Sequence, residues 1–97
     1  MLQYILDEYG NPVLEFNAVK WAEWFETADR HIAQDIFGDV KVSTVFLGLD
    51  HSFNDGVPIL YETMIFGGEH NDYQERYATK EQALAGHAKA VALVLNN

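Results

Sequence analysis

One segment, residues 48–62, gathers the side chains best suited to bind a metal ion or transfer a proton, in the sequence GLDHSFNDGVPILYE. Asp50, His51 and Asp55 supply carboxylate and imidazole groups, which are common metal ligands. Their spacing matches neither the calcium-binding loop nor the zinc-binding His-Glu-x-x-His helix. Asn, Asp and Gly are also the residues that turns prefer. We interpret the segment as a polar loop between two strands, with a metal site at Asp50, His51 and Asp55 as the alternative.

A second polar group, Glu69, His70 and Asp72, follows the next predicted strand. About eight residues of strand, or roughly 26 Å, separate it from the 50–55 loop, so the two groups cannot bind one ion within a single chain. Neither serine lies in the G-x-S-x-G turn of hydrolases, and the chain has no cysteine for thiol chemistry. The sequence therefore predicts no catalytic centre and no cofactor, and it favours a binding protein over an enzyme.

Net charge narrows the class of partner. Fifteen acidic residues against six basic ones give a formal net charge of −9. Binding to nucleic acid or to an anionic membrane needs clustered Lys and Arg, and the basic residues here are scattered, so we expect neither. A partner protein with a basic surface fits the charge, and solubility alone is the alternative explanation. The residues predicted to contact a partner are Asp50, Asp55, Glu69, Asp72, Glu75 and Trp24.

Length and composition predict a single globular domain spanning residues 1–97, because 48% of the residues are hydrophobic. The first residues, MLQYILDEYGNP, contain no basic segment and only a short apolar run, so we expect neither a signal peptide nor a membrane span. The absence of cysteine fits a reducing compartment. Together these features predict a cytoplasmic location.

The first third of the chain predicts a short strand and a short helix. Residues 2–6 alternate weakly between apolar and polar and lead into turn residues at 7–12. Asn17 is a good N-cap, and the apolar residues after it recur at helical spacing up to about Thr27. Trp24 lies off this stripe, so we expect it to be exposed. The stripe comprises Ala18, Trp21, Ala22 and Phe25.

The middle of the chain predicts a meander of strands. Gly38-Asp39 is a two-residue hairpin signal between the runs 31–37 and 40–49. A further strand, residues 57–66, ends at a pair of glycines, and residues 69–78 are interpreted as a polar connection. The pattern therefore predicts antiparallel neighbours joined by tight turns and loops.

The C-terminal part predicts a longer helix that begins with a Thr-x-x-Gln capping box at Thr79 and Gln82. We expect His87 to be a hydrogen-bonded core histidine, and Gly86 indicates close packing on the sheet. The order β-α-β-β-β-α predicts an α+β fold, an antiparallel meander of three to four strands with two helices. The apolar face predicted for the last helix is Leu84, His87, Ala88, Val91, Val94 and Leu95.

The hairpin signals also predict a strand register, which pairs Phe37 with Val40, His31 with Phe46, and Phe46 with Glu62. In this register each face of the meander carries eight apolar residues. Two helices, one of them short, are expected to cover one face but not both. We therefore predict that the second face is buried in a two-fold homodimer. Helices packed on both faces of the sheet are the alternative.

The chain resembles a group of small phage and prophage proteins whose shared pattern runs V-S-T-V-F-L-G-L-D-H, then E-T-M-x-F-G-G, then R-Y-x-T-x-x-E-A-x-x-G-H. Here these motifs stand at 42–51, 62–68 and 76–87, with Gln82 where the group has Glu. The resemblance covers about four-fifths of the chain. It implies a phage-encoded protein that works inside an infected bacterium, where small acidic phage proteins often bind and block host defence or replication proteins.

Charge, the missing catalytic constellation and this resemblance lead to one functional hypothesis. We expect a small acidic protein that acts by protein–protein interaction and inhibits a nucleic-acid-binding host protein, such as a CRISPR effector. The first alternative is a metal-binding domain or metal-dependent enzyme that uses the 50–55 loop with ligands from a second chain. The second alternative is a virion or assembly component.

Overall fold

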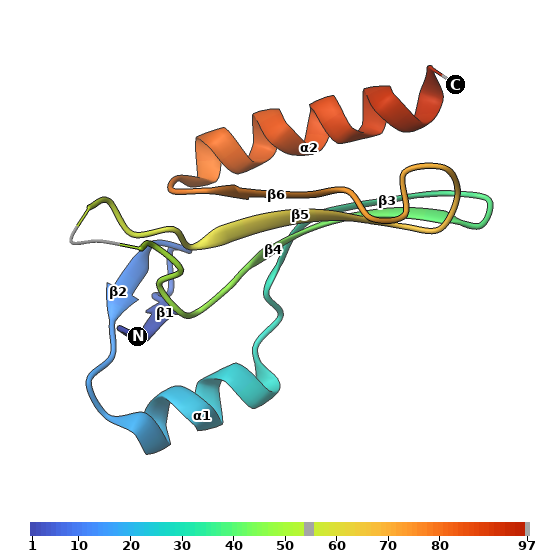
Figure 1. Ribbon diagram of the computed structural model, residues 1–97. Coiled ribbons are helices and arrows are strands. Elements are labelled where there is room, and N and C mark those ends of the chain that lie inside the picture. The colour runs from blue at the N-terminus through green and yellow to red at the C-terminus, as the bar shows by residue number, and fades with distance from the viewer. Residues whose placement is uncertain (54–55, 97) are drawn as a thin grey trace.

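The structure is a computed structural model that describes residues 1–53 and 56–96. Within this part of the chain it has the predicted α+β fold, with two helices and two antiparallel sheets (Figure 1). Asp55, one of the predicted site residues, lies outside the described residues. No helix of the described part is long and apolar enough to cross a membrane. The elements are β1 (Tyr4–Leu6), β2 (Pro12–Leu14), α1 (Ala18–Thr27), β3 (His31–Phe37), β4 (Val40–Phe46), β5 (Tyr61–Phe66), β6 (Gln74–Tyr77) and α2 (Lys80–Leu95).

The larger sheet forms the centre of the molecule, and its strands run in the order β3-β4-β5-β6. Helix α2 lies across one face of this sheet, whereas α1 and the β1-β2 ribbon lie at one end on the other side (Figure 1). The sequence prediction missed β2 and β6. All three residues of β2 are exposed, and β6 has the polar sequence QERY, so neither strand shows the apolar alternation that identifies a half-buried strand.

Both helices begin at the predicted caps. The Asn17 side chain accepts hydrogen bonds from the backbone N–H groups of Val19 and Lys20, both at 3.0 Å. The Thr79 hydroxyl accepts from the Gln82 N–H at 3.1 Å, and the Gln82 side chain accepts from the Thr79 N–H at 3.3 Å, which completes the capping box. These bonds satisfy amides that no helical carbonyl can reach.

Helix α1 packs through aromatic side chains that the predicted stripe includes only in part. The rings of Trp21 and Phe25 stack with centroids 4.7 Å apart, and Trp21 Nε1 donates to two backbone carbonyls at 3.0 and 3.1 Å. Trp24 packs edge-on against the core residue Phe46, with ring centroids 5.9 Å apart. The expectation that Trp24 is exposed is therefore wrong, because the helix contacts the domain over an arc that includes both tryptophans.

The predicted register holds at the first turn and fails further along β3. Phe37 pairs with Val40 across the two-residue turn, as predicted. A bulge near the start of β3 adds a residue to that strand, so His31 pairs with Val45 instead of Phe46. Nothing in the turn chemistry at the far end of the hairpin predicts this bulge.

Between β4 and β5 the register also differs from the prediction by one residue. Phe46 pairs with Tyr61 and not with Glu62. The loop between these strands is held by the Asp50 carboxylate, which accepts a hydrogen bond from the Ile59 N–H at 3.0 Å. A slip of one residue exchanges the two faces of a strand, so every side chain of β5 lies on the face opposite to the predicted one.

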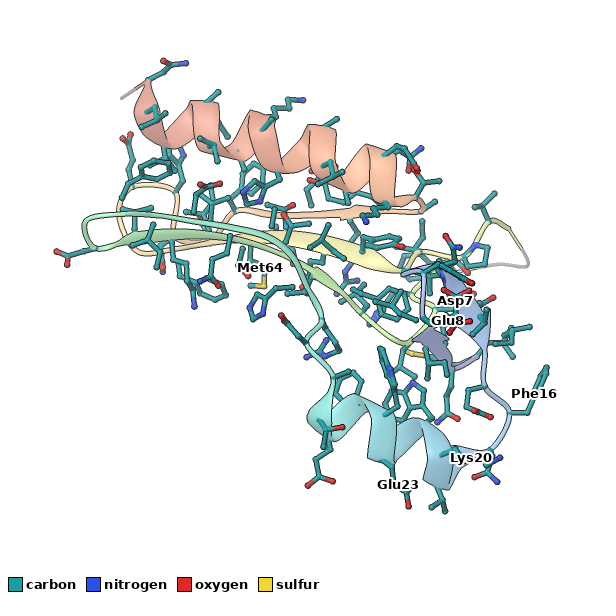
Figure 2. All side chains as sticks on the ribbon, turned by 180° about the vertical axis from the view of Figure 1, so that it is seen from behind. Asp7, Glu8, Phe16, Lys20, Glu23 and Met64 are labelled. Carbon is teal, nitrogen blue, oxygen red and sulfur yellow. The ribbon has the colours of Figure 1, made fainter. Side chains whose placement is uncertain are left out.

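The corrected register gives the two faces of the sheet different compositions. Helix α2 covers the face that carries Val42, Phe46, Tyr61 and Ile65, each at most 1% exposed. Met64 lies on the opposite side, the open face (Figure 2). A mixed open face is normal for an antiparallel sheet, so the prediction of eight apolar residues per face is wrong, and the homodimer based on it stays a prediction. The open face comprises Gln34, Ile36, Lys41, Ser43, Val45, Glu62, Met64, Phe66, Gln74 and Arg76.

Helix α2 turns its small side chains toward the sheet. A Cβ atom at Gly86 would collide with the Tyr77 ring, so the helix and the sheet approach closely at this point, as the sequence predicts. Leu84 and Leu95 are exposed, although the apolar periodicity assigned them to the buried face. The predicted face is therefore rotated about the helix axis, because close approach selects small residues over large ones. The buried residues of α2 are Ala83, Gly86, His87 and Ala90.

Candidate functional site

Asp50, one of the predicted metal-site residues, stabilises the loop that contains it. Asp50 Oδ1 accepts hydrogen bonds from the backbone N–H groups of Ser52 at 2.8 Å and Ile59 at 3.0 Å. Burial acts to raise the pKa of Asp50, but these backbone hydrogen bonds outweigh it and lower the pKa below its ordinary value. Within residues 1–53 and 56–96, no group of three His, Asp or Glu residues could hold a metal ion. The metal alternative gains no support from the described part of the loop.

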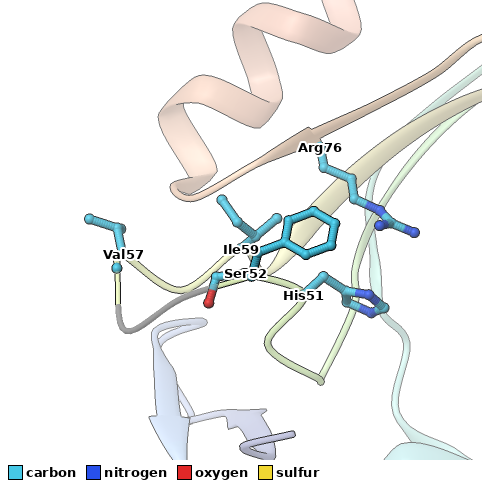
Figure 3. A pocket seen from close by; sticks show the side chains of 7 residues that line it. His51, Ser52, Val57, Ile59 and Arg76 are labelled. Carbon is cyan, nitrogen blue, oxygen red and sulfur yellow. The ribbon is translucent and has the colours of Figure 1, made fainter.

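A cavity of about 370 Å³ lies beside this loop (Figure 3). The side chains of His51 and Arg76 lie on one side of it, and Val57 lies on the other (Figure 3). Arg76 Nε donates to Glu62 Oε2 at 2.9 Å, so this guanidinium already has an anionic partner. The arrangement offers an imidazole and a guanidinium beside apolar walls. The residues around the cavity are His51, Ser52, Phe53, Gly56, Val57, Ile59 and Arg76.

A chain of hydrogen bonds connects α2 to three strands of the sheet. His87 Nε2 lies 2.7 Å from Asp35 Oδ2, and His87 Nδ1 lies 2.7 Å from Thr44 Oγ1. Thr44 Oγ1 lies 2.5 Å from Thr63 Oγ1. A neutral imidazole protonated at Nε2 satisfies the whole chain, since it donates to the carboxylate and accepts from Thr44. The prediction of a hydrogen-bonded core histidine is confirmed.

A carboxylate, an imidazole and a hydroxyl in series also form the arrangement that activates a nucleophile in hydrolases. Here the hydroxyls of Thr44 and Thr63 belong to residues that are 0% exposed beneath α2. A substrate cannot reach either oxygen while the helix is in place. The network therefore fastens α2 to the sheet and does not carry out chemistry on a bound molecule.

A second cavity, of about 330 Å³, lies between β6 and the neighbouring flank of α2. We call it the β6–α2 groove. Its strand wall consists of alternate residues, which share one face of the sheet, and its helix wall consists of positions i, i+3, i+4 and i+7, which form one stripe. The strand wall is Tyr73, Glu75 and Tyr77, and the helix wall is Gln82, Ala85, Gly86 and Lys89.

The groove exists because the helix wall is small at its centre. Ala85 brings only a methyl group into the groove, whereas at Gly86 the Tyr77 ring packs directly against the helix. The Tyr77 hydroxyl is buried, and the described residues offer it no hydrogen-bond partner of good geometry. Burial raises the pKa of Tyr77, and the nearby Thr63 hydroxyl acts in the opposite direction. This part of the groove thus combines apolar rings with a polar atom that lacks a partner.

One edge of the groove is a sheet edge. Strand β6 is the last in the order, so it has no neighbour beyond it within the described residues. The Ile65 N–H donates to the Tyr73 carbonyl at 3.3 Å, which shows that Tyr73 directs its backbone groups toward β5. Backbone direction alternates along an antiparallel strand, so Gln74 and Arg76 direct their N–H and C=O groups toward the free edge.

The residues predicted to contact a partner fall into different parts of the molecule. Trp24 packs in the core, and Asp50 closes its own loop. Glu69, Asp72 and Glu75 are exposed, and they lie within or just before β6. Glu75 lines the β6–α2 groove itself. Of the predicted contact residues that the structure describes, Glu75 therefore lines the groove, and Glu69 and Asp72 lie in the exposed segment before β6.

Several basic side chains are engaged inside the molecule. Arg30 Nη1 donates to a backbone carbonyl at 2.9 Å, and its guanidinium lies 4.1 Å from an aromatic ring centroid. Lys41 lies over the Phe66 ring at 4.9 Å, and Arg76 pairs with Glu62. Because these cations are already partnered, they are less available than the exposed carboxylates to a binding partner.

Sequence reasoning missed the groove because its decisive residues are small and far apart in the chain. Ala85 and Gly86 carry no chemistry of their own, and the tyrosines stand in a segment interpreted as a connection. No protein family, curated protein or solved structure matches the chain. The resemblance to phage proteins thus stays a prediction, and the function is argued from the geometry.

Proposed function

We propose that the chain is a small acidic, phage-type protein that acts by binding a partner protein with a basic surface. The observation that carries this proposal is the position of its free charges. Glu69, Asp72 and Glu75 are exposed beside an open sheet edge, whereas Arg30, Lys41 and Arg76 are held by contacts within the molecule. A negative field of this kind favours encounter with a positive surface.

The proposed partner is a nucleic-acid-binding protein of the bacterial host, and the proposed effect is inhibition. A surface that binds phosphates through Lys and Arg also binds carboxylates, so an acidic protein can occupy it in place of nucleic acid. The resemblance to small phage proteins supports a site of action in the cytoplasm of an infected bacterium. A CRISPR effector is one partner of this chemistry.

A non-enzymatic role fits the burial of the one reactive series that the described residues contain. His87, Asp35 and Thr44 are arranged in the order that catalysis would need, but Thr44 is inaccessible. Binding through the surface requires no such access. The proposal therefore assigns the network to stability and the exposed groups to recognition.

A pull-down from bacterial lysate with matched charge variants tests the proposal. One variant carries Glu69→Lys, Asp72→Lys and Glu75→Lys, and the control carries Glu8→Lys, Glu23→Lys and Glu26→Lys. Both change the formal net charge from −9 to −3, because each of three reversals adds two charges. We expect the unmodified chain and the control to retain a partner at about 50 mM salt and to release it at about 500 mM.

The variant with reversals at Glu69, Asp72 and Glu75 should retain much less of that partner than the control at about 50 mM salt. Absence of any retained protein at low ionic strength would contradict the proposed function, because charge attraction is strongest there. Equal loss in both variants would contradict the assignment of recognition to the segment 69–75. Circular dichroism of both variants checks that they fold like the unmodified chain.

A further inference from the structure

We infer that the β6–α2 groove receives an extended, basic segment of the partner, which joins the sheet as an additional strand beside β6. This inference rests on the proposed function and names the way in which the partner is held. It follows from two features of the groove, a free strand edge and a side-chain cavity next to that edge, and from the net charge of −9 of the chain.

The free edge supplies the main-chain contacts. Gln74 and Arg76 direct backbone N–H and C=O groups away from β5, at the spacing that a further strand requires. A strand placed about 4.8 Å from β6 would pair with these groups. Edge addition of this kind gives affinity through the backbone and leaves side chains to decide specificity.

The cavity supplies a place for the side chains of the added strand. Cross-strand neighbours share a face, so partner residues opposite Glu75 point toward α2 and into the groove. Ala85 leaves room there, and the rings of Tyr73 and Tyr77 form an apolar wall. A volume of about 330 Å³ accommodates aliphatic side chains of medium size. The groove thus favours an extended segment with apolar residues at alternate positions.

Charge selects basic residues for the remaining positions. Glu75 lines the groove, and Glu69 and Asp72 precede β6 on the same stretch of chain. Lys89 is the basic residue of the helix wall, and Arg76 is paired with Glu62. The groove itself carries one carboxylate and one ammonium group, so it is the net charge of −9 of the whole chain, together with exposed Glu69 and Asp72 in the segment before β6, that favours Lys or Arg in the partner.

The other sheet edge and a second copy of the chain are poorer candidates. On the β3 side the bond between His87 and Asp35 ties the helix to the edge strand, and the bulge in β3 interrupts regular pairing. A second copy would bring its own charge of −9 to an acidic groove, and like charges oppose such contact. A basic segment from another protein meets neither obstacle.

The probe for this inference is a capped peptide of about ten residues in which Lys and Val alternate. One control peptide alternates Glu and Val. A second control is the Lys–Val peptide with N-methyl groups on every second amide, which removes the hydrogen bonds along one edge. We expect saturable binding of the Lys–Val peptide alone, with amide chemical shifts that change along β6 and the adjoining flank of α2.

Matched variants localise the binding. Ala85→Trp fills the groove from the helix wall, and Ala88→Trp places the same side chain at an exposed position of α2 that does not line it. We expect Ala85→Trp to weaken peptide binding at least about tenfold and Ala88→Trp to leave it unchanged. Thermal unfolding of both variants checks their folding.

Several outcomes would overturn the inference. One is that the N-methylated peptide binds as well as the Lys–Val peptide, and another is that Ala85→Trp binds the Lys–Val peptide fully. A third is that the peptide changes amide chemical shifts only in β3. The last is that the shifts of groove residues change when the chain is concentrated without any peptide. If the chain still captures a partner in a salt-sensitive way after Ala85→Trp and after the charge reversals in 69–75, binding in the groove is contradicted and the proposed function is left intact. Failure to capture any partner would defeat the function itself, so the two results remain distinguishable.

Discussion

The two flanks of α2 meet the same sheet in different ways. Toward β3, His87 reaches across the interface and bonds to Asp35, whose side chain is 51% exposed. Toward β6, Gly86 packs directly against Tyr77, and beside this contact lies a cavity of about 330 Å³ that Ala85 helps to line. The His87–Asp35 hydrogen bond therefore bridges the β3 flank, whereas a cavity lies along the β6 flank.

This difference shows how one helix can serve both stability and recognition. The buried chain through Thr44 and Thr63 anchors the helix near its middle, so the β6 flank need not be filled for the helix to stay in place. A groove kept open in this way is available to a ligand without unfolding. Substitutions on each flank can therefore test the stabilising role of the β3 side and the open groove of the β6 side separately.

The largest effect is expected from Gly86→Val, which removes the close approach on the β6 flank. The first added atom would already collide with the Tyr77 ring, so the helix must move away from the sheet. We expect a loss of about 3 kcal/mol in the free energy of unfolding. Urea denaturation measures it, with Ala88→Val as the exposed control, expected to cost less than about 1 kcal/mol. Equal stability of the two variants would show that α2 does not pack against Tyr77.

Breaking the bridge on the β3 flank should have the next largest effect. His87→Ala leaves the hydroxyls of Thr44 and Thr63 buried with fewer partners and opens a cavity beneath the helix. We expect a loss of about 2 kcal/mol in the free energy of unfolding. Leu84→Ala, at an exposed position of the same helix, serves as the control and should cost about 0.5 kcal/mol or less. A cost no greater than that of the control argues against the anchor.

A comparison of two carboxylates sharpens the difference between the flanks. Asp35→Ala removes the acceptor of the His87 Nε2–H and should cost about 1 kcal/mol. Glu75→Ala removes an exposed carboxylate of the groove and should change stability by less than about 0.5 kcal/mol. Chemical denaturation of both variants measures the difference. A larger loss of stability for Glu75→Ala than for Asp35→Ala would contradict a stabilising role for the β3 flank.

The smallest effect concerns the pH dependence that Tyr77 confers. Burial raises the pKa of Tyr77 above its ordinary value of about 10. A raised native pKa gives stability that is complete below the unfolded pKa and is lost as pH rises through the native one. The unmodified chain should therefore lose stability above pH 10 more steeply than Tyr77→Phe. If the unfolding free energies of the two proteins fall equally between about pH 9 and pH 11, a buried Tyr77 hydroxyl is contradicted.

Local signals predicted much of the fold. The caps at Asn17 and Thr79, the turn between Phe37 and Val40, and the core position of His87 each depend on a few neighbouring residues. The register of β5 depends instead on a long-range contact between Asp50 and the Ile59 amide, which no local pattern encodes. That single slip placed every β5 side chain on the face opposite to the predicted one.

The candidate site was harder to predict than the fold. The loop at 48–62 is conspicuous because its side chains carry charge, whereas Ala85 matters through the space it leaves and Gly86 through the close approach of Tyr77. Strand β6 was missed because a polar edge strand lacks apolar alternation. The acidic residues Glu69, Asp72 and Glu75 were nonetheless identified from charge alone, and Glu75 lines the groove.

Amide hydrogen exchange in the presence of the Lys–Val peptide tests whether an extended segment pairs with the free edge of β6. Gln74 and Arg76 direct their N–H groups to the β6 edge, and the alternation that starts at the first turn directs those of Gln34 and Ile36 to the β3 edge. The bound peptide should slow exchange at Gln74 and Arg76 and leave Gln34 and Ile36 unchanged. Unchanged exchange at β6, or protection that appears at β3, would contradict strand addition beside β6.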